Sequence, residues 1–178
     1  MPLEPEGNSA MNEPAGADKE GNLYLDDLQV GQRFMSGSQA VEADRIKAFA
    51  AEFDPQPFHL DEAEASRTVF KGLAASGWHT AAVTMRLLVD GGLPIANGLI
   101  GMGAEIAWPR PTRPGDVLRV ETEIVAIAPS RTRPDRGIVT IRSETRNHKE
   151  DIVQTLLAKV VVPRRAAVAK DSIERASQ

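Results

Sequence analysis

The stretch Phe53-Asp54-Pro55-Gln56-Pro57-Phe58-His59 contains two side chains that can move protons, those of Asp54 and His59, five positions apart. Each proline between them fixes its own φ at about −65° and lacks a backbone N–H. A proline also disfavours the helical conformation in the residue before it, so Asp54 and Gln56 are expected to be extended. The stretch predicts a rigid, non-helical bridge that holds a carboxylate and an imidazole around one water. On residue types alone, the alternative is that Asp54 ends a helix and His59 is an ordinary half-buried histidine.

The composition is that of an ordinary globular domain, with 42% apolar and 26% charged residues among 178 and no cysteine. The lack of cysteine excludes disulfides, iron–sulfur clusters, thiolate zinc sites and a cysteine nucleophile. Residues 1–22 hold five acids and one base, and the rest of the chain holds 20 of each, so a nucleic-acid partner is not expected. No apolar run approaches the ~20 residues of a membrane span, and the N-terminus lacks a secretory pattern. We expect a cytoplasmic location.

Helical periodicity marks two segments of the chain. Between residues 44 and 53 the apolar side chains recur at the spacing of one helix face, and Pro55 ends the pattern. Ser76 is a candidate N-cap for a longer helix over residues 77–90. A short helix over residues 61–66 is expected between the two.

Runs rich in β-branched residues mark the strands. In one of them Val120, Thr122 and Ile124 alternate with charged residues, which predicts one buried and one solvated face. The expected strands are one at residues 33–41 and four after the long helix, at 99–108, 117–127, 137–146 and 152–162. This order favours an α+β fold in which an antiparallel sheet wraps around one long central helix.

These motifs resemble those of the MaoC-like acyl dehydratases and (R)-specific enoyl-CoA hydratases, which have the hot-dog fold. The family signature is an aromatic residue, then D-x-N-P-x-H, then an acidic residue two positions on. Here it reads Phe53, Asp54-Pro55-Gln56-Pro57-Phe58-His59 and Asp61. Ser76-Gly77-Trp78 matches a family segment at the start of the central helix, and residues 108–116 look like the strand and turn that follow it.

The resemblance covers residues 23–163, which we expect to form a single MaoC-like domain. Residues 1–22, rich in Gly, Pro, Glu and Ala, are expected to be a disordered N-terminal tail. Residues 164–178 are expected to be a polar C-terminal tail.

The resemblance implies reversible hydration of a trans-2-enoyl-CoA or acyl-carrier thioester to the (R)-3-hydroxyacyl thioester, without a cofactor. A metal is not expected either, because no further His or Cys completes a ligand set with Asp54, His59 and Asp61. Asp54 and His59 would perform the acid–base chemistry on a water. The backbone N–H of Gly77, at the positive end of the helix dipole, would donate to the thioester oxygen. Glycine suits this position because no Cβ obstructs the approach of the thioester.

Five further residues are expected to contact the substrate, and two histidines are set aside. Arg110 and Arg113 could bind the phosphates of CoA or of the arm of a carrier protein. Alternatively, they are charged residues at the rim of a proline-rich loop. His79 is expected to be a core histidine with its hydrogen bonds satisfied, and His148 a solvated residue of a turn. The expected substrate-binding residues are Gln56, Ser76, Trp78, Arg110 and Arg113.

Two other functions stay open on this fold. A thioesterase would use a carboxylate on or near the central helix, and no acid lies between residues 77 and 89. A non-catalytic acyl-thioester-binding subunit is kept open by Gln56, which stands where the family motif usually has Asn. The family further implies at least a homodimer, with the active site near the interface.

Overall fold

The computed structural model describes residue 18 and residues 21–165. The expected tails, residues 1–22 and 164–178, lie almost entirely outside these described residues. The domain boundaries at 23 and 163 stay predictions.

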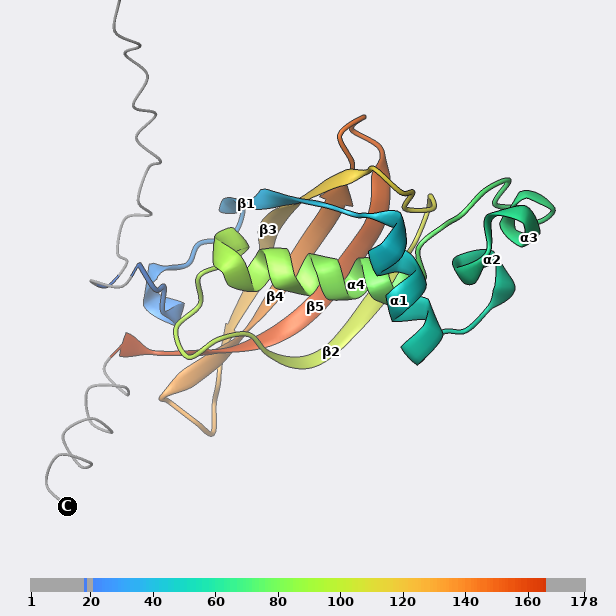
Figure 1. Cartoon of the computed structure of the whole chain (residues 1–178). Coiled ribbons are helices and arrows are strands. Elements are labelled where there is room, and N and C mark those ends of the chain that lie inside the picture. Colours follow the sequence, from blue (N-terminus) through green and yellow to red (C-terminus); the bar gives the residue numbers. More distant parts are fainter. Residues whose placement is uncertain (1–17, 19–20, 166–178) are drawn as a thin grey trace, which may run out of the picture.

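A single antiparallel sheet of five strands forms the body of the molecule, as the sequence predicted (Figure 1). Its strands stand in the order β1-β3-β4-β5-β2, so the strand before the central helix and the strand after it lie on opposite edges. The β4–β5 pair is the hairpin predicted around residues 147–151. The bounds are β1 Arg33–Ala40, β2 Ile100–Ala107, β3 Val117–Pro129, β4 Arg136–Arg146 and β5 Ile152–Pro163.

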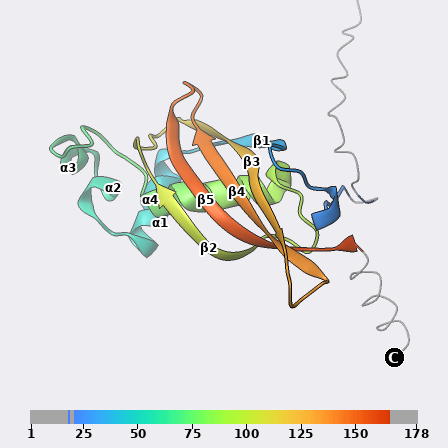
Figure 2. The same ribbon diagram turned by 180° about the vertical axis from the view of Figure 1, so that it is seen from behind.

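The central helix α4 (Gly77–Leu87) crosses one face of the sheet, and the strands curve around it (Figures 1 and 2). It buries Val83 and Leu87 against inward residues of β3 and β4 such as Val120 and Val139. The predicted helix, 77–90, is too long by one turn. After Leu87 the chain opens into a π-helical turn, η2 (Leu88–Gly92), because Gly91 takes a φ of 115°, which only glycine adopts readily.

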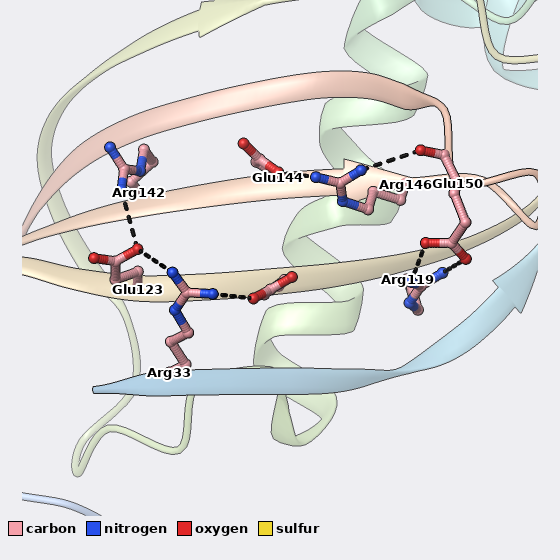
Figure 3. Close-up of polar contacts among 8 residues, drawn as sticks. Arg33, Arg119, Glu123, Arg142, Glu144, Arg146 and Glu150 are labelled. Atoms are coloured by element: carbon pink, nitrogen blue, oxygen red, sulfur yellow. Dashed lines mark hydrogen bonds and ion pairs between the residues drawn. The ribbon is translucent and has the colours of Figure 1, made fainter. Parts of the chain in front are cut away.

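The outer face of the sheet is charged, as the alternation in β3 predicted. Arg33 contacts Glu121 and Glu123 at 3.1 and 3.3 Å, and Arg142 reaches the same Glu123 at 3.0 Å (Figure 3). The intervening residues of β3 point inward and are buried. These exposed pairs each contribute only about 0–1 kcal/mol, so the apolar inner face provides most of the stability.

Three short helices stand between β1 and α4, at the end of the sheet where α4 begins (Figure 1). They are α1 (Ala43–Phe53), α2 (Pro57–Leu60) and α3 (Glu62–Ser66), and η1 (Leu25–Asp27) precedes β1. The sequence predicted α1 and α3 closely but not α2. Within the described residues, no helix is both long enough and apolar enough to span a membrane.

The inward side chains of β3 should carry the stability of the sheet. Ile124 is fully buried, whereas its neighbour Val125 is 36% exposed. We expect Ile124→Ala to lower the free energy of unfolding by about 2–5 kcal/mol, because it leaves a cavity beneath α4. Val125→Ala is the matched control and should cost under about 1 kcal/mol. Urea unfolding measures both, and equal losses would contradict this assignment of the core.

Candidate active site

The chain between α1 and α2 brings a carboxylate and an imidazole together. Asp54 caps the C-terminus of α1, and its N–H donates to the Ala50 carbonyl at 2.9 Å. Gln56 is extended as predicted, with φ −85° and ψ 141°, whereas Asp54 has φ −151° and ψ 67°. The non-helical bridge is shorter than predicted and ends at Gln56. Pro57 starts α2, because the first residue of a helix needs no N–H donor, so His59 is helical.

One hydrogen bond fixes the tautomer of His59. Its Nδ1 lies 2.7 Å from the Ala74 carbonyl oxygen, which can only accept, so Nδ1 must carry the proton. In the neutral ring Nε2 is then an acceptor, and it faces Asp54 Oδ2 across 3.5 Å. The His59 side chain is 5% exposed and that of Asp54 18%. With a neutral ring, two acceptors converge on one small space at the edge of solvent, whereas a protonated ring would pair with the Asp54 carboxylate.

The Asp54 carboxylate is held in its ionised form. A hydrogen bond from the Ser76 side chain is the largest cause of its lowered pKa; partial burial opposes the shift, and Gln56 and His59 add to it. The Gln56 amide donates to Asp54 Oδ1 at 2.7 Å. The longer amide that replaces the motif's Asn therefore still braces the carboxylate. At neutral pH Asp54 is charged and can accept a proton.

The N-terminus of α4 points at the same place. Ser76 caps the helix as predicted, and its hydroxyl accepts the Trp78 N–H at 3.2 Å. Gly77 is the first helical residue, so its N–H has no acceptor within the helix. A Cβ at position 77 would lie 2.7 Å from the indole ring of Trp108. The close-packed indole is therefore what requires glycine here, whereas the sequence suggested that the glycine makes room for substrate.

A hollow of about 570 Å³ joins these groups, and we call it the Asp54–His59 hollow. Phe58, Phe70 and Trp108 give it an apolar wall. All of the predicted site residues except Arg113 line it: Asp54, Gln56, His59, Ser76, Gly77, Trp78 and Arg110.

Arg113 does not line the hollow, and its expected role in substrate binding stays a prediction. Its guanidinium donates to three backbone carbonyls, those of Phe70, Gly72 and Leu73. These carbonyls precede Ala74, so Arg113 holds the segment that carries the partner of His59. Arg110 lies at the rim, paired with Asp151 and largely exposed.

The two histidines set aside lie outside the hollow. His148 is exposed in its turn, as predicted. His79 is buried and stacks on Phe49 with ring centroids 4.7 Å apart. Burial, with a contribution from Arg45, lowers the pKa of His79. Its Nδ1 has no hydrogen-bond partner among the described residues, so it is a core histidine but not a satisfied one. No group of three or more His, Cys, Asp or Glu side chains that could hold a metal occurs in the described ranges.

Two residues of the site gave no usable signal in the sequence. Ala74 acts through its backbone carbonyl, which no side-chain pattern reveals. Trp108 stood in a stretch that resembled the family, but only the contact with Gly77 shows that it forms a wall.

Ser76→Ala should raise the pKa of Asp54, because it removes the largest stabilising contact of the carboxylate. A lowered folded-state pKa gives stability that is present above the unfolded pKa of about 4 and lost as pH falls through the folded value. Part of that stability should therefore be missing at neutral pH in the variant. Carbon-13 NMR titration of the Asp54 carboxyl reads the shift directly. Gln56→Ala should cause a smaller rise, and the reverse order would contradict the ranking of the two contacts.

Arg113→Lys separates a structural from a phosphate-binding role. Lysine keeps the charge but cannot reach three carbonyls in the fork geometry of arginine. We expect a loss of about 1–3 kcal/mol in the free energy of unfolding, measured with urea. Arg110→Lys at the exposed rim is the control and should lose little. If Arg113→Lys kept full stability and instead weakened CoA-thioester binding, a structural role for the Arg113 contacts with the three carbonyls would be the wrong interpretation.

Comparison with known proteins gives consistent results. Residues 28–147 match the family described as MaoC like domain. The chain is 35% identical over 129 residues to the uncharacterized protein YdeM of Bacillus subtilis, covering 72% of this chain and 90% of YdeM. It is 30% identical over 111 residues to the 3-hydroxybutyryl-CoA dehydratase of Methylorubrum extorquens, covering 62% and 69% of the two chains.

Solved structures agree with the fold. A MaoC-like dehydratase from Rhodospirillum rubrum is 63% identical, with a TM-score of 0.80 over 81% of this chain and 99% of that one. The (R)-hydratase of A. caviae involved in PHA biosynthesis is 29% identical, with a TM-score of 0.60 over 77% and 97% of the two chains. The predicted hot-dog architecture, an antiparallel sheet around a central helix, is thereby confirmed.

Proposed function

Because the chain belongs to the family of MaoC-like domains, as its motifs predicted, we propose that it is a hydro-lyase acting on acyl thioesters. In this proposal it adds water reversibly to a trans-2-enoyl thioester and gives the (R)-3-hydroxyacyl thioester, without a cofactor. The names of two relatives, a 3-hydroxybutyryl-CoA dehydratase and an (R)-hydratase, support this direction. The observation that supports it best is the convergence of Asp54, His59 and Gly77 on one hollow.

The two acceptors suit the binding of a single water. With Nδ1 protonated, His59 offers a lone pair at Nε2, and ionised Asp54 offers one at Oδ2, 3.5 Å away. A water between them would donate one O–H to each group and keep its own lone pairs free for attack on Cβ. Asp54 would take the proton, and the departure of solvent as the thioester binds would raise the basicity of its carboxylate.

The balance of the reaction is simple. The water oxygen forms a bond to Cβ, the Cα–Cβ double bond opens, and negative charge moves to the thioester oxygen. The Gly77 N–H and the helix dipole would stabilise that charge, and one such donor is typically worth about 3–4 kcal/mol of the barrier. The proton taken from water returns to Cα through the Asp54–His59 pair. Dehydration runs the same steps backwards.

The carrier arm would leave the hollow past its rim. Arg110 and Trp78 lie there, and a guanidinium suits the phosphates of CoA or the phosphopantetheine of a carrier protein. Arg113 is not included in this proposal.

A second copy of the chain is the proposed partner. The α4 helix presents the exposed apolar side chains of Trp78 and Met85, and η2 presents that of Val89. The edge strand β2 presents Ile100 and Met102. An uncovered edge strand beside an apolar helix face is an unfavourable surface in water. Pairing of two chains would cover it, and Trp78 would bring the interface to the hollow.

Asp54→Asn and His59→Asn should each lower kcat by about 10²–10⁴-fold, since each removes one proton acceptor of the water. The assay follows the loss of conjugated-thioester absorbance with crotonyl-CoA and longer trans-2-enoyl-CoA substrates. Circular dichroism checks that the variants fold. His148→Asn, which changes an exposed histidine outside the hollow, is the matched control and should keep full activity.

Two outcomes would overturn the proposal. Near-full turnover in both variants would exclude the pair as the acid–base groups. Release of free thiol from acyl-CoA without any change in the double bond would instead indicate a thioesterase.

A further inference from the structure

A second space adjoins the Asp54–His59 hollow along two elements. This apolar cavity, of about 330 Å³, lies between α4 and the strands β2, β4 and β5, and it is open to solvent along β2, where Gly101, Gly103 and Ala104 are exposed. Gly77 lines the hollow, and Ala81, one turn further along α4, lines the apolar cavity. In the same way Trp108 lines the hollow and Ile106, two residues earlier, lines the cavity. The two spaces therefore adjoin within ~6 Å along the helix.

One hydrogen-bonded pair stands at the boundary between them. Trp108 belongs to the lining of the hollow and Gln154, on β5, to that of the apolar cavity. The indole N–H of Trp108 donates to Gln154 Oε1 at 2.8 Å. Gln154 is only 1% exposed, and a buried amide is costly unless it is hydrogen-bonded. The bond therefore fixes both side chains.

Two further contacts hold the indole in place. Its ring lies so close to Gly77 that a Cβ there would come within 2.7 Å. Its edge meets Trp78 in a T-shaped contact, with ring centroids 5.4 Å apart at 76°. Trp108 therefore cannot move away without losing its contacts with Gly77, Trp78 and Gln154 together.

We propose that Trp108, held by Gln154, closes the apolar cavity to the acyl chain and so restricts this protein to short enoyl thioesters. The inference rests on the proposed function, because it assumes that the thioester carbonyl sits at Gly77. A short acyl chain then ends within the Asp54–His59 hollow. The additional methylene groups of a longer chain would find a second apolar space in the cavity, and the indole stands in their way.

Trp108→Ala tests directly whether the indole keeps the acyl chain out of the apolar cavity. The quantity to compare is kcat/KM for trans-2-octenoyl-CoA divided by that for crotonyl-CoA. The wild type should favour crotonyl-CoA, and the variant should raise the ratio at least about tenfold, because burial of even one methylene group is worth a factor of that order. Gln154→Leu, which cannot accept the indole N–H, should shift the ratio in the same direction by less.

A double variant shows where the longer chain goes. Ala81→Leu fills the apolar cavity from α4 without touching the hollow. On the Trp108→Ala background it should abolish the gain with octenoyl-CoA and leave turnover of crotonyl-CoA as it was. If Trp108→Ala does not fold, Trp108→Phe, which keeps a ring against Gly77 but lacks the N–H, takes its place.

Binding separates failure of this inference from failure of the proposed function. Calorimetry with butyryl-CoA and octanoyl-CoA measures the same selectivity without turnover, and the ratio of their Kd values should change as the kinetic ratio does. Suppose that the wild type hydrates crotonyl-CoA. If folded Trp108 and Gln154 variants then show the same selectivity as the wild type, or if the wild type itself already favours octenoyl-CoA, closure of the cavity by Trp108 is wrong and the proposed function is unaffected. A wild type that neither hydrates nor binds any of these thioesters overturns both.

Discussion

The hydrogen bond between His59 Nδ1–H and the Ala74 carbonyl determines what the Asp54–His59 hollow can do. Because that carbonyl can only accept, the neutral ring must present the lone pair of Nε2 toward Asp54. The bond depends in turn on the segment that carries Ala74. Arg113 clamps the carbonyls just before it, and the Ala75 N–H donates to the Thr112 carbonyl at 2.9 Å. Arg113, in the loop after β2, thus supports the proposed chemistry without lining the hollow itself.

The start of α4 combines three tasks within three residues. The Ser76 side chain caps the helix and also stabilises the ionised Asp54 carboxylate. Gly77 offers an N–H that the helix leaves unused, at the positive end of its dipole. Trp78 extends the same turn toward the exposed apolar face. A helix that was needed to fill the sheet therefore also supplies the electrostatics of the proposed site.

Trp108 links the fold to the selectivity proposed for this protein. It stands just after the edge strand β2, against the glycine whose N–H is the proposed oxyanion donor. Its bond to Gln154 ties it to β5, the neighbour of β2 in the sheet. Movement of the indole would affect the position of the edge strand and the width of the hollow together. The indole is thus held by its contacts with the sheet and the central helix, although Trp108 itself lies in the loop that follows β2.

The sequence by itself determined the order of the five strands and of α1, α3 and α4, the wet and dry faces of β3, the Ser76 cap and the local pairing of Asp54 with His59. Each of these follows from periodicity or from residues close together in the chain, where the backbone geometry leaves few choices. Only the tertiary structure decided that Arg113 binds backbone carbonyls, that Ala74 sets the tautomer of His59, and that Trp108 covers Gly77. These contacts join residues 15 to 43 positions apart or involve backbone atoms, so no pattern in the side chains encodes them.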